Sequence, residues 1–103
     1  MATVLDQTVL ETAREYLKTL RQNGVQFESA WLFGSFARGH GDENSDIDIA
    51  LVMKDVPARF FKEVELVKYR RKIDSRIEPH ILASDELDSP FGAEIVRTGI
   101  KLA

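Results

Sequence analysis

Two aspartates carry the clearest chemical signal in this chain of 103 residues. Asp46 and Asp48 flank Ile47 and open an apolar run that continues from Ile49 to Met53. Because the side chains of a strand alternate between faces, the pattern places both carboxylates on one face, while Ile47 and Ile49 point into the core. Two carboxylates on one face repel each other unless a cation lies between them. The pair is therefore typical of a Mg²⁺-dependent phosphoryl or nucleotidyl transfer site.

A turn that contains glycine precedes this pair. Gly34-Ser35 follows a hydrophobic run, and ten residues separate Ser35 from Asp46. Gly34 has no Cβ, so the backbone there can approach a phosphate closely. Ser35 offers its hydroxyl and, at the start of a short helix expected over 35–38, amide donors suited to an anion. Arg38 has two possible roles: contact with a phosphate oxygen, or an ion pair with its acidic neighbours at 42–43.

The Gly-Ser motif, its spacing from Asp-x-Asp, and Arg38-Gly39 between them resemble the minimal nucleotidyltransferases of the DNA polymerase β-like superfamily. The chain is most similar to the small prokaryotic members found beside HEPN-domain proteins, over residues 29–82 and 95–102. The resemblance implies an α/β fold of the α+β type, a short mixed β-sheet backed by helices. It also implies ATP as substrate, two Mg²⁺ ions that Mn²⁺ could replace, and transfer of AMP to a tyrosine of a HEPN ribonuclease toxin. This protein would then be the antitoxin.

In this family a third carboxylate on a neighbouring strand completes the metal site. Asp74 and Glu78 are the candidates, and their even spacing would direct both to the face of Asp46 and Asp48. Glu78 falls inside an expected strand, where a charge is costly and suggests a purpose, whereas Asp74 falls where a helix passes into that strand. We therefore favour Glu78. In the two-metal scheme, Asp46 and Asp48 bridge both ions, and Glu78 helps to hold one ion and accepts or orients the proton.

The composition narrows the class of protein. The chain has no cysteine and a net charge of −3, which argues against disulfides and against broad nucleic-acid affinity. It has neither an apolar run of membrane-spanning length nor a signal-peptide pattern, so we expect a cytoplasmic protein. Its length predicts one nucleotidyltransferase domain over residues 1–103.

Hydrophobic spacing predicts the elements that position these residues. An amphipathic helix is expected over 5–22 and ends at Asn23-Gly24. Strands are expected over 28–33, 46–53 and 75–82, and Pro79 indicates that the last lies at a sheet edge or contains an irregularity.

Two further helices are expected. One is capped by Asp55, has Pro57 in its first turn, and buries four apolar side chains: Phe60, Phe61, Val64 and Val67. The other is capped by Ser89-Pro90 and ends at Gly99. The basic residues at 68–72 match the negative end of a helix dipole, although contact with phosphate or an acidic partner is the alternative.

Several alternatives stay open on the sequence alone. Trp31 is interpreted as a core residue, with stacking on a base as the alternative, His40 as a solvated residue, and His80 as partly buried beside Pro79. A domain of this size cannot enclose both nucleotide and acceptor, so we expect a partner to complete the pocket, in a hetero-oligomer or a homodimer. The competing functions are an antitoxin that acts by contact alone and nucleotidyl transfer to a small molecule.

Overall fold

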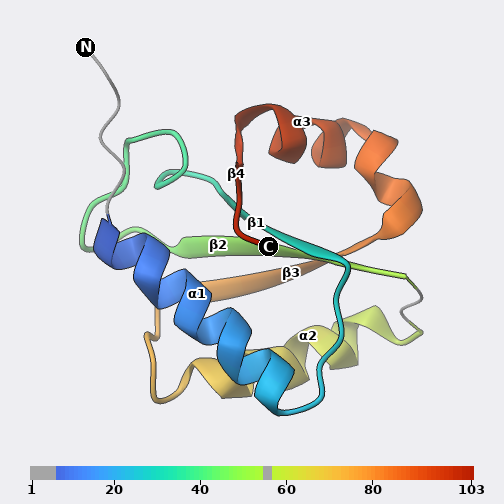
Figure 1. Ribbon diagram of the computed structural model, residues 1–103. Helices are drawn as coiled ribbons and strands as arrows, with labels where there is room; N and C mark the ends of the chain where they lie inside the picture. The colour runs from blue at the N-terminus through green and yellow to red at the C-terminus, as the bar shows by residue number, and fades with distance from the viewer. Residues whose placement is uncertain (1–6, 55–56) are drawn as a thin grey trace.

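The computed structural model describes residues 7–54 and 57–103, and it shows four strands with helices on both sides (Figure 1). The elements follow one another along the chain in this order: α1 (Gln7–Gln22), β1 (Ser29–Phe33), β2 (Ile47–Met53), α2 (Arg59–Val67), the 3₁₀ turn η1 (Lys68–Arg70), β3 (Ile77–Ala83), the 3₁₀ turn η2 (Ser84–Asp88), α3 (Pro90–Thr98) and β4 (Ile100–Lys101). No helix in these two segments is both long and apolar enough to cross a bilayer.

The sheet is mixed, with the strand order β3-β2-β1-β4. Strand β1 runs antiparallel to both β2 and β4, whereas β2 and β3 are parallel. The parallel pair is connected through α2, as a parallel crossover requires. Pro79 lies on β3, which is an edge strand, the first of the two alternatives that the sequence left open. The predicted mixed sheet backed by helices is confirmed.

The sheet buries both of its faces, but unequally. Helices α1 and α2 cover one face, where the larger core contains Ile47, Ile49 and Leu51 of β2. Helix α3 covers the other face, where a smaller core contains Ala50 and Val52 (Figure 1). This alternation along β2 fixes which residues share the face of Asp48.

Helices α1 and α3 agree with their sequence patterns. The apolar spacing assigned six residues to the inner face of α1; Leu5 lies outside the described residues, and the other five are buried: Val9, Leu10, Ala13, Leu17 and Leu20. Ser89 caps α3 by accepting a hydrogen bond from the Gly92 N–H, and Gly99 ends that helix. The turn at Gly24 has φ +82°, the conformation expected after α1.

The predicted buried face of α2 is wrong. Phe60 and Phe61 are 71% and 72% exposed, Val64 is exposed as well, and Leu66 is the buried residue. Pro57 precedes the helix instead of lying in its first turn, and the predicted cap Asp55 lies outside the described residues.

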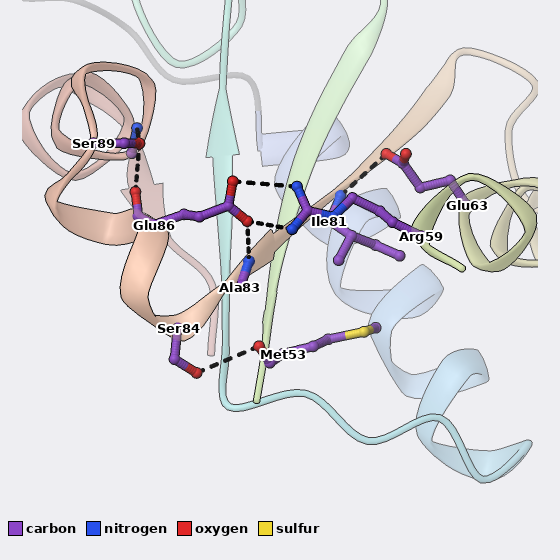
Figure 2. Close-up of polar contacts among 9 residues, drawn as sticks. Met53, Arg59, Glu63, Ile81, Ala83, Ser84, Glu86 and Ser89 are labelled. Carbon is purple, nitrogen blue, oxygen red and sulfur yellow. Dashed lines mark hydrogen bonds and ion pairs between the residues drawn. The ribbon is translucent and has the colours of Figure 1, made fainter. Parts of the chain in front are cut away.

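Polar contacts explain how α2 is oriented. Arg59 at its start forms an ion pair with Glu86, which also accepts a hydrogen bond of 2.8 Å from the Ala83 N–H (Figure 2). One turn further along α2, Glu63 accepts the Ile81 N–H at 3.2 Å. Because β3 is an edge strand, the backbone N–H groups on its outer side have no strand partner. The face of α2 that meets β3 therefore carries the acceptor Glu63 as well as apolar side chains. The phenyl rings therefore face outward.

Two further differences concern short segments. The predicted helix over 35–38 is a turn, in which the Arg38 N–H donates to the Gly34 carbonyl at 3.2 Å and the His40 N–H donates to the Ser35 carbonyl at 2.9 Å. No helix N-terminus therefore forms at Ser35. Strand β4 was not predicted, and it consists of two residues that pair with Trp31 and Leu32 of β1.

Candidate functional site

Three strands bring the predicted residues together where β1 ends and where β2 and β3 begin. This end of the strands is called the carboxylate edge below. Phe33, the last residue of β1, pairs with Asp48 of β2. Asp48 in turn lies beside Glu78 of β3 in the parallel register. The three therefore form a row across neighbouring strands, which are about 4.8 Å apart. Asp46 immediately precedes β2, at the same edge.

The row faces the side of the sheet that carries α3. Ile47 and Ile49 are completely buried on the opposite face, as the alternation predicted. The side chains of Asp48 and Glu78 are 25% and 44% exposed, and Asp46 is exposed. The apolar contacts of α3 lie further along β2, at Ala50 and Val52. The carboxylates therefore stay accessible to solvent and to a ligand.

Gly34 is fitted to Asp48. Its φ of +78° lies in the left-handed region, which favours glycine. A Cβ at this position would lie 3.2 Å from Cγ of Asp48 and closer still to its Oδ2. The turn after β1 thus packs directly against the carboxylate, and any larger residue would displace it.

Basic groups contact two of the carboxylates. Nε2 of His80 lies 3.3 Å from Oδ1 of Asp48, and Nη1 of Arg70 lies 3.7 Å from Oε1 of Glu78. Arg70 also donates a hydrogen bond of 2.7 Å to the Ile77 carbonyl, which fixes its position beside β3. Both contacts place positive or hydrogen-bonding groups where the carboxylates would otherwise face each other.

Asp74, the other candidate for the third carboxylate, has a different environment. It accepts hydrogen bonds from the backbone N–H and the guanidinium of Arg76, the latter at 2.9 and 3.1 Å. The bond from the Arg76 side chain lowers the pKa of Asp74 below its ordinary value. The Asp74 carboxylate is therefore bound by Arg76 within the same turn, whereas Glu78 lies next to Asp48.

The donor set suits a hard divalent cation, although its side chains do not converge. Nowhere in residues 7–54 and 57–103 do three histidine or acidic side chains lie close enough together to hold a metal ion. Asp46, Asp48 and Glu78 nevertheless supply carboxylate oxygens, the ligands that Mg²⁺ prefers, from adjacent positions on one open edge. Asp48 contacts His80 and Glu78 contacts Arg70 in this structure, so both carboxylates would have to exchange these contacts for the ion.

A pocket of about 300 Å³ adjoins this edge. Gly34, Arg38 and Asp48 line one side of it, and α3 supplies the other, including Phe91 and Glu94. Within the described chain, Arg38 forms no ion pair, so of its two possible roles the pairing with its acidic neighbours at 42–43 is not seen. A larger hollow, of about 670 Å³, lies near Phe27 and Lys54, away from the carboxylates.

Sequence reasoning missed the roles of two residues at this edge. His80 is partly buried, as expected, but its contact with Asp48 was not predicted. Its even spacing from Glu78 placed it on the same face and was the available signal. On the sequence alone, Phe91 could be a core residue or one left for an interface; it is 50% exposed and lines the pocket. Trp31 packs in the smaller core and does not line this pocket.

The fold is one that nucleotidyltransferases share. Residues 15–103 match the family described as "Polymerase beta, Nucleotidyltransferase", which covers most of the chain. The protein belongs to this family.

Relatives and solved structures agree with this assignment. The chain is 33% identical over 76 residues to "Putative protein adenylyltransferase MJ0141" of Methanocaldococcus jannaschii, which covers 69% of this chain and 74% of that protein. A second protein of that organism with the same kind of name, MJ1215, is 37% identical over 65 residues, or 63% of this chain and 73% of its own length.

Among solved structures, a nucleotidyltransferase from Sulfolobus solfataricus superimposes with a TM-score of 0.66 at 26% identity, over 90% of this chain and 78% of that one. A toxin–antitoxin with AMP-PNP gives 0.67 at 27% identity, over 89% and 72%. The toxin–antitoxin MntA-HpeT gives 0.65 at 26% identity, over 86% and 70%. That structure is of a variant in which two aspartates, two positions apart, are replaced by glutamate.

Proposed function

We propose that this protein transfers AMP from ATP to a hydroxyl group, with Mg²⁺ held by Asp46, Asp48 and Glu78. The observation that carries the proposal is the register of the parallel pair, which places Glu78 directly beside Asp48 at the open edge. The names of the relatives support adenylyl transfer, and the neighbour with AMP-PNP supports an adenine nucleotide as substrate. The spacing of Asp46 and Asp48 equals that of the two aspartates replaced in the MntA-HpeT variant.

The chain's own residues suggest how the reaction proceeds. The acceptor oxygen attacks the α-phosphorus of ATP, the bond from that phosphorus to the bridging oxygen breaks, and pyrophosphate leaves. Glu78, half-exposed beside Asp48, accepts or orients the proton of the acceptor hydroxyl. Arg38 and the turn that begins at Gly34 lie beside the pocket and bind the phosphates. When bound, Mg²⁺ neutralises phosphate charge and lowers the pKa of the acceptor hydroxyl.

We further propose that the acceptor is a tyrosine of a HEPN toxin, with which the protein forms a hetero-oligomer. The toxin–antitoxin neighbours support a toxin partner. The small, open pocket also supports a partner, because about 300 Å³ is the lower limit of a typical ligand site and leaves the acceptor outside.

The proposal is tested with ATP labelled at the α-phosphate, Mg²⁺, and a candidate HEPN-domain protein as acceptor. The wild type and Asp88→Asn, an exposed aspartate of η2 that does not line the pocket, should label the partner, and Asp48→Asn should not. Equal labelling by Asp48→Asn would refute the site. If Asp48→Asn fails to label the partner but still neutralises the toxin in cells, the contact-only function is correct. Label on a small molecule instead of a protein would refute the tyrosine acceptor.

A further inference from the structure

The pocket between α3 and the end of β1 has two chemically different sides. Gly34, Arg38 and Asp48 form a polar side next to the carboxylate edge. The apolar lining consists of Phe91 and Ile95 of α3 together with Phe33 of β1. A site for a nucleotide needs both kinds of wall, because the phosphates are charged and the base is flat and largely apolar on its faces.

Phe91 presents an open aromatic surface. Its ring meets the Phe33 ring edge to face, with centroids 5.6 Å apart and an interplanar angle of 84°. The Phe33 ring in turn meets His80 at 5.1 Å and 67°, so its position is fixed from two sides. Among the described residues Phe91 thus has one aromatic ring partner, and half of the residue is exposed. It is a supported ring with room for a further stacking partner.

Charge on the α3 side disfavours phosphate there. Hydrogen bonds of 2.7 and 2.8 Å from Arg97 hold Glu94, and they lower the pKa of its carboxyl below the ordinary value. Glu94 is therefore ionised at neutral pH. An ionised carboxylate repels phosphate but accepts hydrogen bonds from neutral donors, such as ribose hydroxyls and base amino groups.

From these observations we infer that this pocket binds the nucleoside part of the donor nucleotide, with the base stacked on Phe91. The inference rests on the proposed function and adds the position of the base. The pocket's volume, about 300 Å³, suits the nucleoside, while the triphosphate extends over the turn at Gly34 toward the carboxylates. Purines have the larger stacking surface, so ATP and GTP bind more tightly than CTP and UTP.

The test compares two ligands by calorimetry in the presence of Mg²⁺: ATP, and inorganic triphosphate, which has no base. Phe91→Leu keeps apolar volume against Phe33 but removes the aromatic face. It should weaken ATP binding by about 5- to 100-fold and leave inorganic triphosphate unchanged. Phe91→Tyr should bind ATP as the wild type does. Phe61→Leu is the control, because Phe61 is also an exposed phenyl but lies on α2, which packs on the opposite face of the sheet.

Each outcome is informative. Unchanged ATP affinity in Phe91→Leu, or an equal loss for both ligands, would overturn the stacking role. Equal affinities for the four nucleotides would overturn the purine preference. If the wild type binds neither ATP nor inorganic triphosphate, the proposed function fails, which is distinct from failure of the stacking role. Thermal unfolding of each variant confirms that the fold is intact.

Discussion

Gly34 packs directly against the carboxylate of Asp48, so Gly34→Ala should affect both the backbone and the proposed site. The left-handed φ of +78° costs an alanine about 1–2 kcal/mol. The added methyl group would also lie 3.2 Å from Cγ and 3.5 Å from Cβ of Asp48, with Oδ2 nearer still. The Asp48 carboxylate must then rotate or shift, which moves it away from the position in which it contacts His80.

Gly24→Ala separates these two effects. Gly24 has a similar φ of +82°, but a Cβ there meets no atom within 4 Å. It therefore carries the backbone cost without a collision. We expect Gly24→Ala to lower the free energy of unfolding by about 1–2 kcal/mol, and the Tm by roughly 5–15 °C, with transfer activity retained.

Gly34→Ala should lose at least as much stability and, in addition, about 100-fold in transfer rate, because a displacement of about 1 Å in a catalytic group has effects of that size. Thermal denaturation and labelled-AMP transfer, measured on both variants below their unfolding transitions, provide the comparison. If Gly34→Ala transfers AMP at the wild-type rate, the close fit between Gly34 and the Asp48 carboxylate has no functional role.

Three further changes test individual contacts. Tyr16 is fully buried and its hydroxyl donates a 2.6 Å hydrogen bond to the Leu66 carbonyl, so Tyr16→Phe should lower the free energy of unfolding in urea by about 1–3 kcal/mol. Asp74→Asn should cost about 1 kcal/mol at neutral pH, with transfer retained. Because Arg76 lowers the pKa of folded Asp74, this stabilisation is present above the ordinary pKa and is lost as pH falls through the folded value. The difference from wild type should therefore shrink below about pH 4 in acid titrations of stability, and a constant difference would contradict the assignment. Glu78→Gln should abolish transfer while changing stability by less than about 0.5 kcal/mol, and full activity would exclude Glu78 as the third carboxylate.

The carboxylate edge was predictable because it depends on local alternation. The residues at 46–49 alternate charged and apolar side chains, and this pattern alone placed Ile47 and Ile49 in the core. The proximity of Asp48 and Glu78 could not be predicted from alternation, because the register of two strands separated by a helix depends on tertiary packing. The family resemblance indicated the pairing, and the spacing could not have done so.

Helix α2 shows where hydrophobic periodicity fails. The rule assigns Phe60, Phe61 and Val64 to the core, but the structure turns them outward. The inward face of α2 contacts an edge strand and carries Arg59 and Glu63, which bind groups on η2 and β3. A pattern of apolar spacing cannot reveal a helix face that is selected partly by hydrogen bonds. The two-residue strand β4 was equally hidden, since it exists only through its pairing with β1.

The central claim is that Asp48 and Glu78, with Asp46, hold the divalent cation. Titration of the protein with Mn²⁺ in a calorimeter tests it directly, without the acceptor or the partner. We expect the wild type and Asp88→Asn to bind Mn²⁺ alike, and Asp48→Asn and Glu78→Gln to bind it at least about tenfold more weakly, a difference of about 1.4 kcal/mol. Wild-type affinity in Asp48→Asn would contradict the account.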